Sequence, residues 1–172
     1  GDASAVAELV EALTDPMRNV RESAILAVVD IYHRHPAELR KALAECEKGP
    51  VAATVNDYLD DEFNDTLRRA SIKILGWLAV DDAVEQLLSL LEFETLQQTA
   101  LDALVDIGRT NPQGLLGSWT GVCGTRRAYL AYILGESECA AALPLLTEAL
   151  QDEDIQVVRM AVHALGSIGT VD

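Results

Sequence analysis

The stretch ALPLLTEALQDEDIQVVRMAVHALGSIG, residues 142–169, decides the fold of this chain. It contains two apolar stripes with the spacing of a helix face, Leu143, Leu146 and Leu150 in the first and Val157, Ala161, Leu165 and Ile168 in the second. The polar run of residues 151–154 separates them. The pattern predicts two helices joined by a turn, and each apolar stripe needs a neighbouring element to cover it.

The second stripe recurs along the chain. With its first residue as position 0, apolar or small residues fall at positions 4, 8 and 11, and the stripes start at residues 20, 67, 96, 126 and 157. The fourth is the weakest, because Arg126 and Ser137 make both its ends polar. The starts are 47, 29, 30 and 31 residues apart, and near-equal steps indicate stacked helical hairpins. The longer first step predicts an extra helix, begun by Pro36, stopped by Gly49-Pro50 and followed by another helix from Val51.

At these residues the chain resembles the HEAT-like repeats, particularly the short bacterial and archaeal type also found in phycobilisome-lyase-like proteins. The unit of that family has an aspartate-rich turn, Val-Arg, Ala four residues after the Val, Leu-Gly and Ile-Gly. Residues 15–31 and 152–169 match it best. The arginine of the turn is present as Arg21 and Arg68, shifted to Arg159 in the last repeat and replaced by Gln97 in the third.

The predicted fold class is therefore all-α. The resemblance implies a right-handed α-α superhelix, a HEAT- or armadillo-like solenoid of about five hairpins. We expect one HEAT-like domain over residues 1–172, with units at roughly residues 3–35, 36–79 (with the extra helix), 81–110, 112–137 and 138–169. The sequence lacks long alternating patterns of Val, Ile and Thr, which would predict strands.

Composition narrows the classes of partner. The formal net charge is −15, and the acidic residues are spread over both halves of the chain. Such a surface repels phosphates, so we expect no nucleic-acid partner and no binding to anionic membranes. No apolar run reaches the roughly 18 residues of a membrane span. Three cysteines without metal-site spacing predict reduced thiols in a cytoplasmic protein.

No group of residues predicts catalysis. His33 and His35 are two residues apart and cannot share a helix face, and His163 has no His or Cys partner at helical spacing. HEAT-like hydroxylases that bind iron carry His-Glu pairs, which none of the three histidines forms. The glycine-rich segment of residues 112–125 lacks the lysine of a phosphate-binding loop, and a shortened helix is the better interpretation. We therefore expect no enzyme activity, no metal and no cofactor.

The surface left for function is formed by positions 2, 6 and 10 of each second helix, which line up on one face of a solenoid. The candidate binding residues there are Arg69, Lys73, Trp77, Asp102, Asp106, Tyr132, Glu136, Arg159 and His163. We expect Trp77 and Tyr132 to be partly exposed. The interpretation is a non-enzymatic scaffold or regulatory module with an unidentified protein partner. The alternative, implied by the resemblance, is an auxiliary subunit of a bilin-lyase-like or other modifying enzyme; a solvated face without partners would look similar.

The last repeat adds an expectation about assembly. It matches the repeat pattern closely, although a terminal repeat normally has a polar outer face. Val158 and Val162 lie beside its core stripe. Either these two valines pack against the fourth repeat, or they face outward. In the second case we expect a longer array, or self-association through this repeat.

Overall fold

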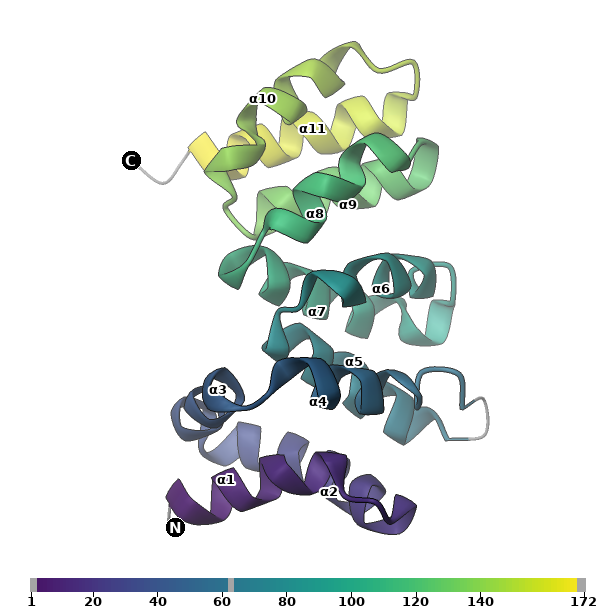
Figure 1. Ribbon diagram of the computed structural model, residues 1–172. Helices are drawn as coiled ribbons and strands as arrows, with labels where there is room; N and C mark the ends of the chain where they lie inside the picture. The colour runs from purple at the N-terminus through teal and green to yellow at the C-terminus, as the bar shows by residue number, and fades with distance from the viewer. Residues whose placement is uncertain (1–2, 62–63, 170–172) are drawn as a thin grey trace. The chain divides into compact units, whose positions relative to one another are not determined.

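A computed structural model describes residues 3–61 and 64–169, and in that part of the chain every regular element is helical. The prediction of an all-α fold is confirmed. The α-helices are α1 (Ala3–Glu11), α2 (Arg18–Arg34), α3 (Pro36–Glu45), α4 (Lys48–Asn56), α5 (Asp65–Leu78), α6 (Val84–Leu90), α7 (Glu94–Thr110), α8 (Gln113–Ser118), α9 (Gly124–Glu136), α10 (Leu143–Glu148) and α11 (Ile155–Gly169) (Figure 1).

The chain divides into two compact units, residues 1–83 and residues 84–172. In the first unit, α2 packs against α1, α3 and α5, and α4 packs against α5. The two helices α3 and α4 occupy the long first step of the repeat, so the extra helix expected there is present. In the second unit, α6 pairs with α7, α10 pairs with α11, and α9 packs against both α7 and α11.

The first helices of the last two hairpins, α8 and α10, are short and are flanked by tighter 3₁₀ turns. Such turns occupy Trp119–Gly121 after α8, Ala140–Ala142 before α10 and Ala149–Gln151 after it. The glycine-rich segment thus forms α8 and the turn that follows, as the sequence predicts. Leu115 and Trp119 are buried, and Leu116 is half-buried. The burial of these apolar side chains stabilises α8, whose glycines by themselves disfavour a helix.

The apolar stripe of the second helices forms the core. In α5 and α7 all four stripe residues are buried, including Ser71 at a position that three of the other four repeats fill with alanine. In α2 the end positions Val20 and Ile31 are only half-buried, and so are Leu165 and Ile168 in α11. The stripe predicted from the sequence is therefore the core, and it is least covered in the first and last hairpins.

Two glycines let neighbouring second helices approach closely. A Cβ added to Gly135 in α9 would lie 2.6 Å from both Cα and Cβ of Ala164 in α11. A Cβ on Gly108 in α7 would lie 2.5 Å from Oγ of Ser137. Real Cβ atoms do not approach so closely, so both positions require glycine as long as the helices keep their separation.

One predicted boundary is wrong. Gly49 and Pro50 do not stop the helix that begins at Pro36; α3 ends at Glu45, and Gly49 and Pro50 lie in the first turn of α4. Proline is tolerated there because the first amides of a helix have no intrahelical acceptor. The inward residues Val51, Val55 and Leu59 are nevertheless buried, as expected.

Candidate functional site

The predicted binding residues lie on the second helices and fall into two groups, one in each unit. Arg69, Lys73 and Trp77 lie on α5 in the first unit. The second unit holds Asp102 and Asp106 on α7, Tyr132 and Glu136 on α9, and Arg159 and His163 on α11. All nine are exposed or half-buried. Ala128, at the same register in α9, is 7% exposed and does not belong to the surface.

A groove between α7 and α9 brings four of these residues together. It has a volume of about 260 Å³ and is lined by Asp102, Asp106, Tyr132 and Glu136 together with Gln98, Leu101, Val105 and Arg109. The four-residue spacing of Gln98, Asp102 and Asp106 puts them on one face of α7. Leu101 and Val105 are half-buried and supply apolar lining. The matching register of α7 and α9 thus places these side chains around one groove.

The groove carries more negative than positive charge. Among the described residues that line it, the one cation is Arg109, whose Nη1 lies 3.9 Å from Oδ1 of Asp106 and whose Nη2 donates to the Glu136 carbonyl oxygen at 3.2 Å. Gln98 donates to Oδ1 of Asp102 at 2.8 Å. Three carboxylates and one guanidinium leave a net negative groove that favours a cationic ligand group.

An aromatic contact extends the groove towards α11. The rings of Tyr132 and His163 have centroids 5.9 Å apart and are tilted by 32°. Nδ1 of His163 lies 4.0 Å from Oε1 of Glu136. Arg159, further along α11, is exposed and donates to the Gln156 side chain at 3.0 Å, so it contributes to the rim.

In the first unit Trp77 belongs to an aromatic cluster that the sequence did not reveal. Its ring stacks on Tyr32 of α2, with centroids 3.8 Å apart and an interplanar angle of 12°. Arg40 of α3 donates to the Tyr32 hydroxyl at 2.6 Å, and its guanidinium lies 5.5 Å from the centre of that ring. Tyr32 falls beyond the four stripe positions and Arg40 lies in the extra helix, so the repeat register could not identify them. Both Trp77 and Tyr132 are half-buried, as expected.

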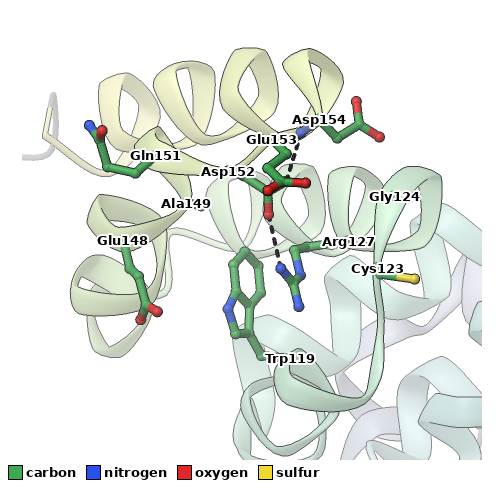
Figure 2. Close-up of a pocket in the computed structure, with 10 residues that line it drawn as sticks. All are labelled: Trp119, Cys123, Gly124, Arg127, Glu148, Ala149, Gln151, Asp152, Glu153 and Asp154. Atoms are coloured by element: carbon green, nitrogen blue, oxygen red, sulfur yellow. Dashed lines mark hydrogen bonds and ion pairs between the residues drawn. The ribbon is translucent and has the colours of Figure 1, made fainter.

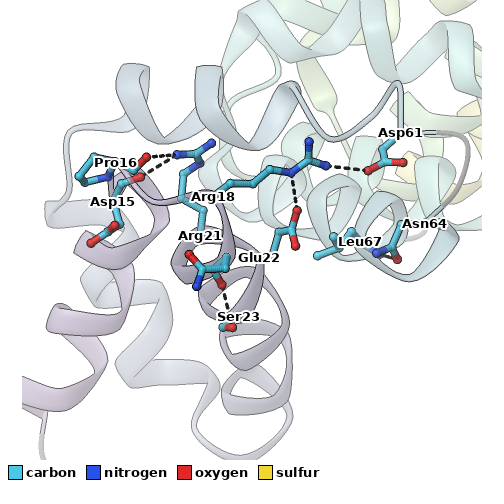
Figure 3. A network of polar contacts seen from close by, with 10 residues as sticks. Asp15, Pro16, Arg18, Arg21, Glu22, Ser23, Asp61, Asn64 and Leu67 are labelled. Atoms are coloured by element: carbon cyan, nitrogen blue, oxygen red, sulfur yellow. Dashed lines mark hydrogen bonds and ion pairs between the residues drawn. The ribbon is translucent and has the colours of Figure 1, made fainter.

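In the first four repeats, the residue after the stripe start closes the turn before its helix. Arg21 donates to the carbonyls of Asp15 (2.8 Å) and Pro16 (3.1 Å), as Figure 3 shows. Arg68 donates to the Leu59 carbonyl at 2.8 Å, and Gln97 donates to that of Leu91 at 2.9 Å. Gln97, which replaces the arginine in the third repeat, therefore forms the equivalent hydrogen bond to a turn carbonyl.

Arg127 is the equivalent residue in the fourth repeat, and sequence reasoning missed it. Its Nε donates to the Val122 carbonyl at 3.0 Å, and its Nη1 to Oδ2 of Asp152 at 2.9 Å. The guanidinium lies 5.8 Å from the centre of the Trp119 ring. Arg159, the shifted arginine of the last repeat, makes no such bond to a turn carbonyl; its partner is the Gln156 side chain.

A larger cavity of about 560 Å³ surrounds Arg127, with the acidic turn of residues 151–154 on one side (Figure 2). Asp152 accepts the backbone N–H of Asp154 at 2.9 Å as well as the bond from Arg127. These bonds, the backbone one first, lower the pKa of Asp152 below its ordinary value. The polar groups at the centre of this cavity bond to one another and hold the turn of residues 151–154 in place. We therefore interpret the cavity as part of the structural framework and not as a binding site.

The described residues contain no group of three or more His, Cys, Asp or Glu side chains placed to hold a metal ion. Burial raises the pKa of the Cys46 thiol, whose sulfur bonds the Leu43 carbonyl at 3.3 Å. The raised pKa favours the protonated thiol over the nucleophilic thiolate. Across residues 3–61 and 64–169, each helix is too short or too polar to cross a membrane.

Residues 125–172 match the family model described as HEAT repeats, a range that covers almost all of α9 and the whole last hairpin. No curated protein matches the chain.

Proposed function

We propose that this chain, whose residues 125–172 match HEAT repeats, is a non-enzymatic interaction scaffold that binds a basic segment of a partner protein. The binding site is the groove between α7 and α9. HEAT repeats generally mediate protein–protein interaction. The observation that carries the proposal is the convergence of Asp102, Glu136 and Tyr132 on this one groove.

The chemistry of the groove fits a lysine or arginine side chain. A cationic head group would pair with Asp102 or Glu136, while the Tyr132 ring offers its face for a cation–π contact. The volume of about 260 Å³ accommodates one or two side chains and is smaller than typical small-molecule pockets. The net charge of −15 would also speed the approach of a basic partner.

The test uses the double variant Asp102→Asn with Glu136→Gln, which removes two charges from the groove and keeps the shape of both side chains. The matched control is Asp60→Asn with Glu85→Gln, which removes two exposed charges elsewhere. We expect the groove variant to weaken binding of a lysine- and arginine-rich peptide at least tenfold in titration calorimetry. The control should weaken it far less. If the groove variant and the control variant lost the same peptide affinity, net charge alone would explain the loss. That result would contradict the groove as the binding site.

The acidity leads us to propose that nucleic acid is not a partner. The free thiols of Cys46, Cys123 and Cys139 lead us to propose that the protein works in a reducing compartment such as the cytoplasm. The matched family is described by its repeat alone, so the alternative role as an auxiliary subunit of a lyase-like enzyme stays a prediction.

We also propose that the last repeat mediates self-association. Val162 on α11 is 58% exposed and Ile155 is 65% exposed, and both are large apolar side chains. Val158 is half-buried beside them.

A further inference from the structure

Helix α5 carries a row of three side chains that donate hydrogen bonds. Arg69, Lys73 and Trp77 are four residues apart in turn, so they lie on one side of the helix. Arg69 is exposed, and the other two are half-buried. We call these three residues the donor row. Helix α5 belongs to the second repeat, and other repeats precede and follow it along the chain, so the exposure of the row is a property of this helix face.

The two cations of the donor row have no partner in the described part of the chain. Arg69 and Lys73 form neither a hydrogen bond nor an ion pair with another described residue. Each of the other lysines and arginines forms at least one such contact. Acidic side chains outnumber basic ones by 28 to 13, so composition alone favours a partner for every cation. Two unpaired cations on one helix face therefore need an explanation.

Carboxylates on the same helix and on α2 pair with other arginines. Asp65, one turn before the donor row, lies 3.6 Å from Arg68. Glu22 holds the first position of the corresponding row on α2, and it pairs with Arg18 at 2.6 Å. The same arginine reaches Asp61 at 3.1 Å (Figure 3). These ion pairs engage three carboxylates and leave the donor row without an acceptor.

The third donor of the row belongs to the aromatic stack. The Trp77 ring is half-buried on Tyr32, and its indole N–H donates to no described residue. The indole nitrogen can donate but not accept, and the same holds for the ammonium and guanidinium groups of the row. The Tyr32 hydroxyl already accepts from Arg40, which places a further cation beside the stack. A ligand that satisfies the donor row therefore has to supply acceptors, and carboxylates are the acceptors that also neutralise its charge.

We propose that the donor row binds an acidic segment of a partner protein. The inference goes beyond the proposed function, because this surface takes the opposite charge and shares no residue with the groove between α7 and α9. The corresponding row on α7 consists of Gln98, Asp102 and Asp106, whose carboxylates are acceptors. The chain thus has two docking surfaces of opposite preference, one in each unit.

The spacing of the donors specifies the pattern of the ligand. Residues four apart on a helix are separated by about 6 Å along its axis. Alternate side chains of an extended segment point to the same side and are about 6.6 Å apart. An extended segment with acidic residues at alternate positions therefore sets one carboxylate beside Arg69 and the next beside Lys73. A third acceptor then reaches the N–H of Trp77.

The charge of the whole chain favours a short acidic segment over a nucleic acid. The net charge of −15 repels every anion, but at physiological salt the screening length is about 8 Å. A short segment therefore responds mainly to the cations that it touches. A nucleic acid carries a phosphate at every nucleotide and extends past two cations onto acidic surface.

The test measures how a synthetic peptide of alternating glutamate and serine binds to the whole chain in titration calorimetry. The row variant, Arg69→Gln with Lys73→Gln, removes two charges and keeps long polar side chains. The control, Lys41→Gln with Arg126→Gln, removes the same charges where each residue pairs with a surface glutamate. Circular dichroism verifies that both variants are folded. We expect the row variant to weaken binding at least about fivefold, and the control less than about twofold.

Fluorescence and a third variant locate the bound peptide. In the Trp119→Phe protein the tryptophan emission comes from Trp77 alone. The acidic peptide should shift this emission and protect it from acrylamide. The variant Trp77→Phe keeps a ring for the stack on Tyr32 but lacks the N–H, and it should weaken calorimetric binding about threefold. An unchanged Trp77 signal at saturating peptide contradicts the donor row as the site.

Two further outcomes overturn the proposal. One is a wild type that does not bind the acidic peptide, or that loses equal affinity in the row and control variants. The other is a single-stranded DNA oligonucleotide that binds more tightly than the peptide and loses its affinity in the row variant. The groove variant Asp102→Asn with Glu136→Gln should still bind the acidic peptide, and the row variant should still bind the basic one. Failure of this proposal is thus distinguishable from failure of the proposed function.

Discussion

Gly135 and Gly166 occupy the same register position in consecutive repeats, but their surroundings give them opposite roles. Substituting alanine at Gly135 places a methyl group 2.6 Å from the Ala164 backbone. We expect Gly135→Ala to lower the free energy of unfolding by about 1–3 kcal/mol, since a packed helix interface must shift. Gly166→Ala meets open space and should raise it by up to about 1 kcal/mol.

Urea unfolding followed by circular dichroism at low protein concentration measures both changes. The two variants make the same chemical change at the same register, so helix propensity cancels in their comparison. If Gly135→Ala were as stable as Gly166→Ala, the tight crossing of α9 and α11 would be wrong.

The two tryptophans differ in exposure, which fluorescence can measure. Trp77 is half-buried in its stack on Tyr32, whereas Trp119 is 6% exposed beneath Arg127. We expect the variant Trp119→Phe, which retains Trp77, to emit at longer wavelength than Trp77→Phe. Acrylamide should quench it more strongly. The reverse order would place Trp77 in the core and remove it from the candidate surface.

At the residue scale, the sequence located the surface but not the contacts made on it. Helical spacing is enough to put Asp102, Asp106 and Tyr132 on one side of their helices, because position within a repeat determines direction. It did not reveal that Ala128 in the same row is covered. That burial depends on the short separation of α9 and α11, which Gly135 permits. A pattern of residues within one helix does not encode the distance to the next helix.

At the scale of the element, the bonds that close the turns contribute to stability. Two adjacent arginines in α9, Arg126 and Arg127, can test this contribution. Arg127 bonds a turn carbonyl and Asp152 and is about one-quarter exposed, whereas Arg126 pairs with Glu92 at the surface. We expect Arg127→Ala to lower the free energy of unfolding by about 1.5–3 kcal/mol, because it loses charge-assisted bonds and leaves a carbonyl unpaired. Arg126→Ala should lower it by less than about 1 kcal/mol. Thermal unfolding of both variants measures the two losses of stability. Equal losses would contradict the role of Arg127 in closing the turn.

The acidic turn should make stability depend on pH. The bonds from the Asp154 backbone and from Arg127 lower the pKa of Asp152 in the folded state. A lowered pKa means that the carboxylate stabilises the fold above the ordinary aspartate pKa of about 3.9. This contribution is lost as pH falls through the lower folded value. The wild type should therefore unfold at a higher temperature than Asp152→Asn at neutral pH.

The difference in unfolding temperature between these two proteins should shrink below about pH 4. Calorimetric scans at neutral and acidic pH measure it, and Glu153→Gln, an exposed neighbour, is the control. A difference that stays constant across this range would mean that Asp152 stabilises the turn without its charge.

At the scale of the element, the sequence predicted which helices exist more reliably than where they end. Helices α3 and α4 followed from the length of the first repeat step, but the boundary between them did not, because Pro50 is compatible with a first turn as well as with a stop. Arg127 was missed although the stripe start at Arg126 gives it the same position as Arg21 and Arg68, because the polar ends of this stripe make the fourth repeat the weakest match to the pattern. The rule that finds it is positional: the residue after each stripe start bonds the preceding turn in four of the repeats.

For the whole molecule, the period of the sequence determined the repeat fold, while the partner depends on surfaces that no period encodes. The regular steps and the match of residues 125–172 to HEAT repeats agree on the architecture. Charge is the property of the whole chain that bears on both the binding of a basic peptide and self-association, and it acts on them in opposite directions.

This opposition gives the last prediction. Binding of a basic peptide relies on attraction to a chain of net charge −15, whereas self-association has to overcome repulsion between two such chains. Raising salt from about 0.1 M to about 1 M shortens the screening length from about 10 Å to about 3 Å. Titration calorimetry should therefore show weaker peptide binding at high salt, whereas sedimentation should show stronger self-association. A shift of both interactions in the same direction would mean that at least one of the two surfaces is misassigned. Repeating both measurements with Asp102→Asn and Glu136→Gln identifies which, because only peptide binding should become less dependent on salt.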